Sequence, residues 1–245
     1  MTTRKVLNGN ILKTIALMAM LIDHIGSLII YPMYLNACII DGVHMMGELI
    51  PKNAKYIYWM YLILRIIGRI AYPIFAFMIV EGFLHTKDLK KYLCRLLLFA
   101  AISEVPYDIA NSNTIFNPIS QNVLWTFAIA LIMLWYLKEK KGKILVVVLI
   151  ASVVSAFSDG GIGGILLIAS MYLFKNDRKR YWIGCTISIV VMTLQFMWIQ
   201  VFALLALFLL EEYNGIRKYG FKFVFYIFYP AHFLLLSYFV LKVVK

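Results

Sequence analysis

The sequence predicts an all-α, polytopic integral membrane bundle that forms a single domain over residues 1–245. Hydrophobic residues make up 63% of the chain, charged residues only 15%, and the mean hydropathy is +0.84. An ordinary soluble domain is less apolar and carries about 25% charged residues. The 16 Tyr, 17 Phe and 5 Trp suit the aromatic belts of a membrane protein. Together these observations exclude a typical soluble fold.

We expect about nine transmembrane helices, within a range of eight to ten, because a helix needs roughly 20 apolar residues to cross a bilayer. The second apolar stretch is too long for one straight crossing, and Gly68 and Pro73 are expected to break it. The fifth to eighth stretches are short, so two of them are candidates for re-entrant segments. The predicted spans are 11–31, 56–84, 92–110, 121–137, 143–158, 161–174, 181–195, 197–211 and 223–241.

The basic residues are divided unevenly between the two sides of these spans. One side receives 18 Lys and Arg residues and the opposite side only four. Because cytoplasmic loops are enriched in Lys and Arg, we predict a cytoplasmic N-terminus and an outer C-terminus, in the plasma membrane of a bacterium. This bias accounts for the net charge of +12, so lipid is an expected partner and nucleic acid is not.

Two exposed loops, 32–55 and 111–120, are predicted on the outer side. The first carries Asp41, His44 and Glu48, and His44 is interpreted as a solvated loop residue, as is His85 on the cytoplasmic side. The stretch SDGGIGG at 158–164 is interpreted as a tight turn rather than an anion-binding loop. The three cysteines have no metal or redox spacing, so no metal is expected.

The most informative polar residues lie inside the predicted spans. Asp23 and His24 are adjacent, about two-thirds of the way along the first span. An ionisable residue inside hydrocarbon costs several kcal/mol unless it is paired or hydrated, so it is a functional candidate by default. Arg65 and Arg69 lie four residues apart and are predicted to share one helical face.

A second pair with the same spacing, Glu104 and Asp108, brackets Pro106, which is expected to distort its helix. Structural ion pairs, Arg69–Glu104 or Arg65–Asp108, are one explanation for these charges. The other explanation is a polar chamber in the outer half of the membrane. By depth, its candidate members are Asp23, His24, Arg65, Arg69, Glu104 and Asp108.

Five blocks of the sequence resemble the TraX family, in the same order and over nearly the whole chain. They are LKTIALMAMLIDHIG at 12–26, LRIIGRIAYPIFAFMIVEGFLHT at 64–86, KKYLCRLLLFAAISEVPYD at 90–108, QNVLWT at 121–126 and FYPAHFLLL at 228–236. The resemblance implies acetylation of a pilin N-terminus, or a related transfer typical of the wider transmembrane acyltransferase group. It also implies that His24 is catalytic and that Arg69 corresponds to a basic residue of that group's arginine motifs.

The residues suit this chemistry independently. Transfer of acetyl from acetyl-CoA to an amine or hydroxyl needs a base or a nucleophile, and histidine can serve as either. Glu104 or Asp108 could orient the histidine, and Arg65 or Arg69 could stabilise the oxyanion. The candidate catalytic residues are His24, Asp23, Arg69, Glu104 and Asp108. The candidate substrate-binding residues are Arg65, Glu81, Gln121, Asn122 and His232.

Four basic residues at the cytoplasmic end, Lys87, Lys90, Lys91 and Arg95, are expected to hold the phosphates of acetyl-CoA. The acceptor, a protein N-terminus or a surface glycan, would approach from outside. Two other classes remain open. A transporter would use the buried charges as a pathway and predicts an inverted repeat, which we do not detect. A non-catalytic assembly factor would not need His24.

Overall fold

The computed structural model describes residues 5–40, 52–139, 143–216 and 222–243, and within them the protein is all-helical. Two isolated β-bridges occur there, but no strand. A π-helical turn, Gly26–Ile30 (η1), and a 3-10 helix, Trp198–Leu204 (η3), interrupt the series of α-helices. The α-helices are α1 Gly9–Ile25, α2 Tyr31–Ile40, α3 Lys52–Gly68, α4 Ala71–His85, α5 Leu89–Ser112, α6 Val123–Glu139, α7 Ile144–Val154, α8 Gly161–Leu173, α9 Arg178–Gln195, α10 Leu205–Glu211 and α11 Lys222–Val243. The all-α prediction is confirmed for these residues.

The first helix is longer than the sequence predicts. α1, η1 and α2 follow one another without a break, so helix replaces the start of the predicted loop 32–55, and α3 replaces its end. That loop prediction is wrong for these residues, whereas Asp41, His44 and Glu48 lie outside the described residues. The wide turn of η1 immediately precedes Pro32, which has no N–H for a helical hydrogen bond. The chain therefore continues as a helix beyond a residue that usually ends one.

The predicted break in the second apolar stretch is confirmed between α3 and α4. α3 ends at Gly68, although the Arg69 N–H still donates to the Arg65 carbonyl at 3.2 Å. Pro73 lies in the first turn of α4, where its missing N–H removes no hydrogen bond. In contrast, Pro106 does not end α5, which runs from residue 89 to residue 112.

The helices differ in their capacity to cross a membrane. Two helical stretches are long and apolar enough, Gly9–Cys38 with 30 residues and Ala54–His85 with 32, at mean hydropathies of 1.7 and 1.9. α7 has only 11 residues, so it rises about 16 Å, roughly half of a hydrocarbon core. The shorter apolar helices are Ile144–Val154, Gly161–Leu173, Trp198–Glu211 and Val224–Val240.

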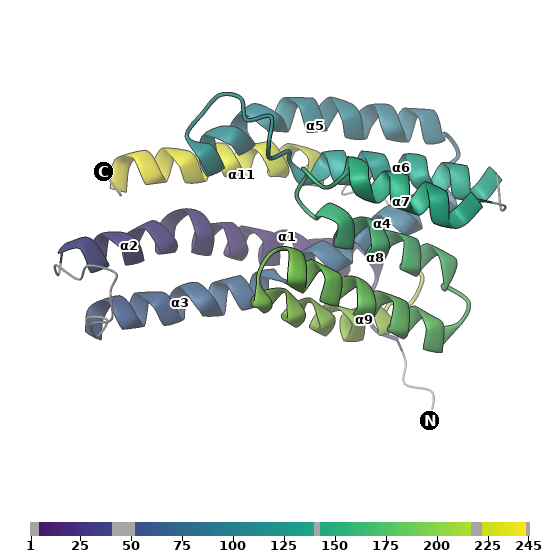
Figure 1. Cartoon of the computed structure of the whole chain (residues 1–245), viewed down its shortest axis with the longest axis horizontal. Helices are drawn as coiled ribbons and strands as arrows, with labels where there is room; N and C mark the ends of the chain where they lie inside the picture. Colours follow the sequence, from purple (N-terminus) through teal and green to yellow (C-terminus); the bar gives the residue numbers. More distant parts are fainter. Residues whose placement is uncertain (1–4, 41–51, 140–142, 217–221, 244–245) are drawn as a thin grey trace.

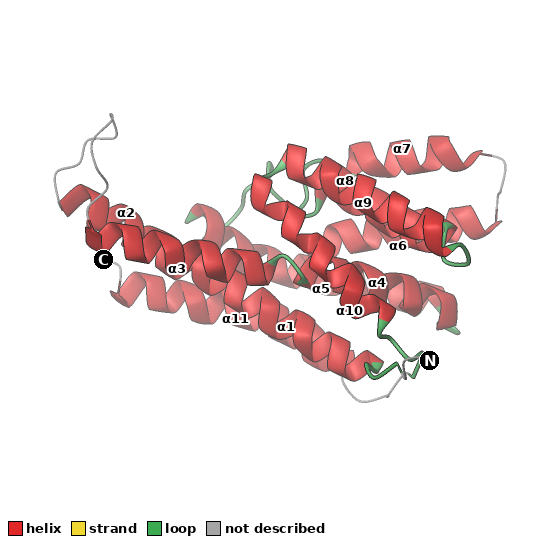
Figure 2. Cartoon of the chain, turned by 90° about the horizontal axis from the view of Figure 1, so that it is seen from below, coloured by secondary structure: helices red, strands yellow, loops and turns green. Residues whose placement is uncertain are grey.

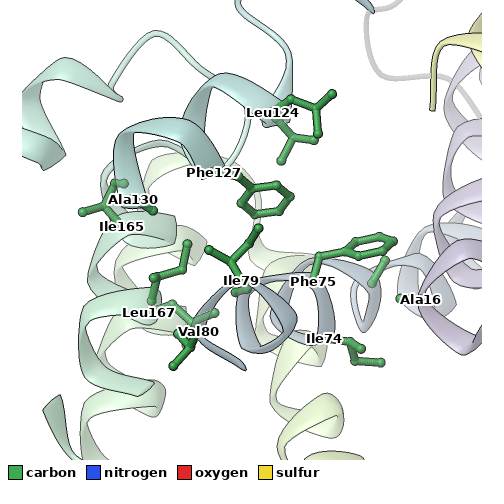
Figure 3. Packing of buried hydrophobic residues seen from close by; sticks show 14 of the residues in the cluster. Ala16, Ile74, Phe75, Ile79, Val80, Leu124, Phe127, Ala130, Ile165 and Leu167 are labelled. Atoms are coloured by element: carbon green, nitrogen blue, oxygen red, sulfur yellow. The ribbon is translucent and has the colours of Figure 1, made fainter. Parts of the chain in front are cut away.

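α4 is the central helix of the bundle because it is buried on every side. It contacts α1, α6, α8 and α10. Figure 3 shows Ile74, Phe75, Ile79 and Val80 of α4 in the apolar core, with Phe127 of α6 packed above them. A helix that is apolar all round has to be enclosed by others. The four helices that contact α4 are therefore packed around it.

The two ends of the described chain lie at opposite ends of the bundle (Figures 1 and 2). The N-terminal end holds the α4–α5 turn, the α8–α9 turn and the facing ends of α6 and α7. Leu7 also forms a bridge with Tyr213, which ties the start of the chain to the segment after α10. These are the regions that carry the basic clusters in the sequence.

The SDGGIGG stretch forms the tight turn between α7 and α8, as predicted. Gly160 has a φ of 99° and Gly161 of 50°, a region that favours glycine. Gln121 pairs with this turn, because its N–H donates to the Phe157 carbonyl at 2.8 Å and its carbonyl accepts from Asp159 N–H at 2.8 Å. The turn and the start of α6 are therefore held together.

Candidate functional site

An ionic cluster joins α1 to the end of α3. The Asp23 carboxylate accepts from both arginines of the predicted pair: Arg65 at 2.5 Å through one oxygen, and Arg69 through the other. Arg69 also donates to the Gln200 side chain of η3 at 3.1 Å. The three charged side chains are only 11–15% exposed. Two buried guanidiniums thus share one carboxylate.

Gly68 permits this arrangement. A Cβ at this position would overlap the side chain of Asp23, so only glycine lets α1 approach α3 this closely. The alternative ion pairs considered from the sequence, Arg69–Glu104 and Arg65–Asp108, are wrong, because Asp23 binds both arginines. The prediction that the two arginines share a face is confirmed.

His24, the residue after Asp23, is joined to His232 of α11. His24 Nδ1 lies 2.7 Å from His232 Nε2, and His232 Nδ1 lies 3.0 Å from the Phe228 carbonyl oxygen. His232 is only 2% exposed, whereas His24 is partly buried. The expectation that Glu104 or Asp108 orients His24 is therefore wrong, since its partner is another histidine.

Aromatic rings hold the two imidazoles in place. The His24 and His232 ring planes are inclined by only 21° with centroids 4.9 Å apart, as expected for rings joined edge to edge by a hydrogen bond. Phe228 stacks on His232 at 5.3 Å, and Phe233 contacts His24 at 4.6 Å and His232 at 4.3 Å. Packing on this scale restricts both rings to one orientation, as a defined proton transfer requires.

A second polar cluster lies between α5 and α6. Glu104 Oε2 accepts from the Trp125 indole N–H at 2.7 Å and from the Asn122 amide, which also donates to the Ala100 carbonyl at 2.8 Å. Asp108 Oδ2 accepts from the Asn117 backbone N–H at 2.8 Å. The other oxygen of each carboxylate is buried and has no hydrogen-bond partner among the residues that the structure describes.

α11 lies between the two clusters. Phe233, which contacts His24, also meets the ring of Tyr107 edge-on at 5.5 Å, one residue from Asp108 on α5. The Tyr229 hydroxyl accepts from the Val123 N–H at 3.4 Å, next to Asn122. Five of the six residues expected in one polar chamber thus form two clusters, and the sixth, His24, belongs to the histidine pair that lies between them.

A cavity of about 450 Å³ opens at the N-terminal end of the bundle. Its interior is apolar and includes Phe75 and Phe127, both labelled in Figure 3. Its basic lining residues are Lys13, Lys87, Lys91 and Arg95, and Asp88 also lines it and pairs with Lys91 at 3.3 Å. Phe225 and Tyr226 of α11 also line it, six or seven residues before His232, which corresponds to a rise of about 9–10 Å. We call this cavity the basic pocket.

Other predicted site residues lie elsewhere. Lys90 does not line the basic pocket, unlike its three predicted companions. Glu81 lies near that pocket rather than the histidine pair, and accepts from the Tyr213 hydroxyl at 3.3 Å. Gln121 is occupied in binding the α7–α8 turn. The loop interpretation of His85 is wrong, because it ends α4 and lines the basic pocket.

Several residues that complete these sites have little signal in the sequence. Gln200 binds Arg69 from η3, and Trp125 binds Glu104. Asp159, interpreted only as a turn residue, lies within electrostatic reach of Arg69, Arg65 and Asp23. Lys13 lines the basic pocket from α1. Charge balance offered no signal for Asp159 or Gln200, because Asp23, Glu104 and Asp108 already outnumber the two arginines inside the predicted spans.

Comparison with known proteins identifies the family. The model of the family described as "TraX protein" matches residues 8–240. A relative from Dichelobacter nodosus, named "Probable fimbrial assembly protein FimC, serogroup H1", is 28% identical over 206 residues, which cover 73% of this chain and 83% of the relative. No solved structure matches the chain. Because the family model spans nearly the whole sequence, including both histidines and both charged pairs, this chain belongs to the TraX family.

Proposed function

We propose that this protein is an integral membrane acetyltransferase. It moves acetyl from cytoplasmic acetyl-CoA to an amine or hydroxyl of an acceptor at the outer face of a bacterial plasma membrane. The observation that carries the proposal is the position of the basic pocket relative to His24. One helix, α11, lines the pocket with Phe225 and Tyr226 and contacts His24 through His232.

The proposed membrane arrangement follows from the direction of the helices. The predicted spans correspond to alternating passes between the two ends of the bundle, in which the paired stretches α1–α2, α3–α4 and η3–α10 each make one pass. An odd number of passes suits termini at opposite ends. The basic-rich end of the bundle faces the cytoplasm under the positive-inside rule. In this arrangement the polar clusters would lie within the membrane region, where neighbouring helices separate them from lipid.

The basic pocket is the proposed donor site. Its rim of Lys13, Lys87, Lys91 and Arg95 offers charge for the phosphates of acetyl-CoA, and its apolar interior suits the remainder of the donor. Lys13 thereby replaces Lys90 in the set expected from the sequence. From this pocket the acetyl group would extend along α11 toward the histidine pair.

His24 is the proposed group that carries the transfer, either as a general base for the acceptor or as a transient acetyl carrier. Arg65 or Arg69 would stabilise the developing oxyanion. Asp23 would act indirectly by holding both arginines. Glu104 and Asp108, each with one bare buried oxygen, would face the acceptor.

The acceptor belongs to an outer-face partner, and the fimbrial relative favours a pilin-type N-terminus over a surface glycan. The same name also suits a non-catalytic assembly factor. Label transfer separates these roles: purified protein in liposomes should pass radioactive acetyl from acetyl-CoA to an acceptor peptide. The His24→Ala variant should not. Wild-type protein that transfers no label to either a peptide or a glycan acceptor would exclude the enzyme.

The orientation is tested with an impermeant maleimide on intact cells. Cys38, Cys94 and Cys185 are first replaced by serine or alanine, because Cys94 is exposed. A cysteine at Ile115, which is 73% exposed, should react from outside, and a cysteine at Lys138 should react only after lysis. The reverse pattern would invert the orientation.

A further inference from the structure

The hydrogen bonds of the histidine pair define where its protons lie. The Phe228 carbonyl can only accept, so His232 Nδ1 must carry a hydrogen to make the 3.0 Å contact. A neutral His232 then presents a lone pair at Nε2. Because His24 Nδ1 lies 2.7 Å from that atom, His24 Nδ1 must supply the hydrogen between them. His24 is left with its lone pair on Nε2.

The alternative is a doubly protonated His232 that donates to His24. It requires a second positive charge beside a cluster in which two arginines already share one carboxylate. His232 is 2% exposed, and aromatic rings rather than carboxylates surround it. An uncompensated buried charge is unfavourable, so the neutral pair is favoured.

We infer that His232 is a positioning residue that holds His24 in the tautomer with a bare Nε2, an inference that rests on the proposed acetyl transfer. With this tautomer, Nε2 takes the proton of the acceptor while the acceptor heteroatom bonds to the carbonyl carbon of the thioester. The C–S bond breaks, its electron pair leaves with sulfur, and the sulfur takes up the proton from Nε2. His24 returns to its starting state, and His232 Nε2 accepts the Nδ1 hydrogen throughout.

The difference between the two histidines in burial supports this division of roles. His24 is partly buried and belongs to the helix that carries Asp23, whereas His232 is enclosed by Phe228 and Phe233. The His24 ring, which is the less buried of the two, is therefore the one that can reach a substrate. The inner ring has both nitrogens engaged, one with Phe228 and one with His24, and has no atom left for the acceptor.

The test compares His232→Phe, which keeps an aromatic ring but no acceptor, with His232→Gln, whose side-chain oxygen can still accept from His24. His232→Phe should lower kcat at least about 10-fold, with an upper limit near the 10⁴-fold that a wrong tautomer costs a serine protease. The KM values for donor and acceptor should stay within about twofold. His232→Gln should recover part of the lost kcat, a rescue that a purely structural role would not give.

A second measurement is independent of activity. Nitrogen NMR of ¹⁵N-histidine-labelled protein, assigned with His24→Ala, should find hydrogen on Nδ1 and a bare Nε2 in His24. A folded His232→Phe variant with wild-type kcat would overturn the inference, as would a His24 with hydrogen on Nε2. If His232→Phe does not fold, the inference is judged from the kcat of His232→Gln and from which His24 nitrogen carries the hydrogen. If wild-type protein transfers no acetyl, the proposed function fails, and the tautomer is still measured.

Discussion

The two buried charged clusters each contain a pair of like charges four residues apart, but only one of the pairs binds an opposite charge within the part of the chain that the structure describes. Arg65 and Arg69 are four residues apart on α3, and both bind the carboxylate of Asp23. Glu104 and Asp108 are four residues apart on α5, and neither binds a cation among the described residues. Each keeps one buried oxygen without a hydrogen-bond partner there. The first cluster is closed by an ion pair, whereas the second remains open to a donor.

This difference separates structural from functional contributions. Loss of Asp23 from the closed cluster leaves two unpaired charges, so it should act mainly on stability. The open cluster has already buried its carboxylates with neutral donors such as Asn122 and Trp125, so its bare oxygens are available to a ligand. The histidine pair lies between the two clusters.

The largest expected effect is on stability. Asp23→Ala leaves Arg65 and Arg69 buried without a carboxylate, and we expect a loss of about 3–5 kcal/mol. Thermal unfolding of the purified variant in detergent, together with its yield in membranes, measures this. Asp88→Asn is the matched control, because asparagine caps the start of α5 as well as aspartate does. A variant as stable as wild type would mean that the ion pairs contribute nothing net.

The next effect is on catalysis without loss of fold. His24→Ala should reduce acetyl transfer by at least roughly 10²-fold, the lower end for a lost general base. Its melting temperature should stay close to the wild-type value, because a neutral, partly buried imidazole leaves no orphaned charge. His85→Ala provides a matched imidazole deletion. Since His85 lines the basic pocket, it should alter the KM for acetyl-CoA and leave kcat unchanged.

A smaller effect, on the KM for the acceptor, is expected from the open cluster of Glu104 and Asp108. Glu104→Gln replaces the carboxylate with an amide of nearly the same shape and so removes the charge. If the Glu104 carboxylate binds an amine acceptor, the KM for that acceptor should rise about 10-fold or more in the variant, since hydrogen bonds to charged groups contribute about 1.5–3 kcal/mol. A hydroxyl acceptor should be affected less. Ser103→Ala, a buried neighbour on α5, is the control. Equal KM values for both variants would remove Glu104 from the acceptor site.

The sequence predicted the features that depend on local periodicity. The shared face of Arg65 and Arg69 and the break at Gly68 follow from helical geometry within a few residues. The partners did not follow, because Asp23 is 42 residues from Arg65 and His232 is 208 residues from His24. A single sequence contains no information on which distant elements pack together. The candidate residues were therefore identified more reliably than their partners.

The extent of the helices was harder to predict for a different reason. Pro32 ordinarily marks the end of a helix, and the wide turn of η1 that accommodates it has no clear signature in the sequence. Pro106 likewise lies inside a continuous helix, α5, so the expected distortion there does not end the helix.

The smallest expected effect concerns the basic pocket, whose charged side chains are less buried than those of the two clusters. Lys87→Gln, Lys91→Gln and Arg95→Gln should each raise the KM for acetyl-CoA by roughly 2- to 5-fold, because exposed charge pairs contribute about 0.2–1 kcal/mol. The effects should shrink as salt is added, since screening weakens contacts with phosphate. Lys90→Gln is the matched control, because Lys90 is adjacent in sequence but does not line the pocket. If Lys90→Gln raises KM as much as Lys91→Gln, the charges act through the general potential of this end of the protein, and the donor binds elsewhere.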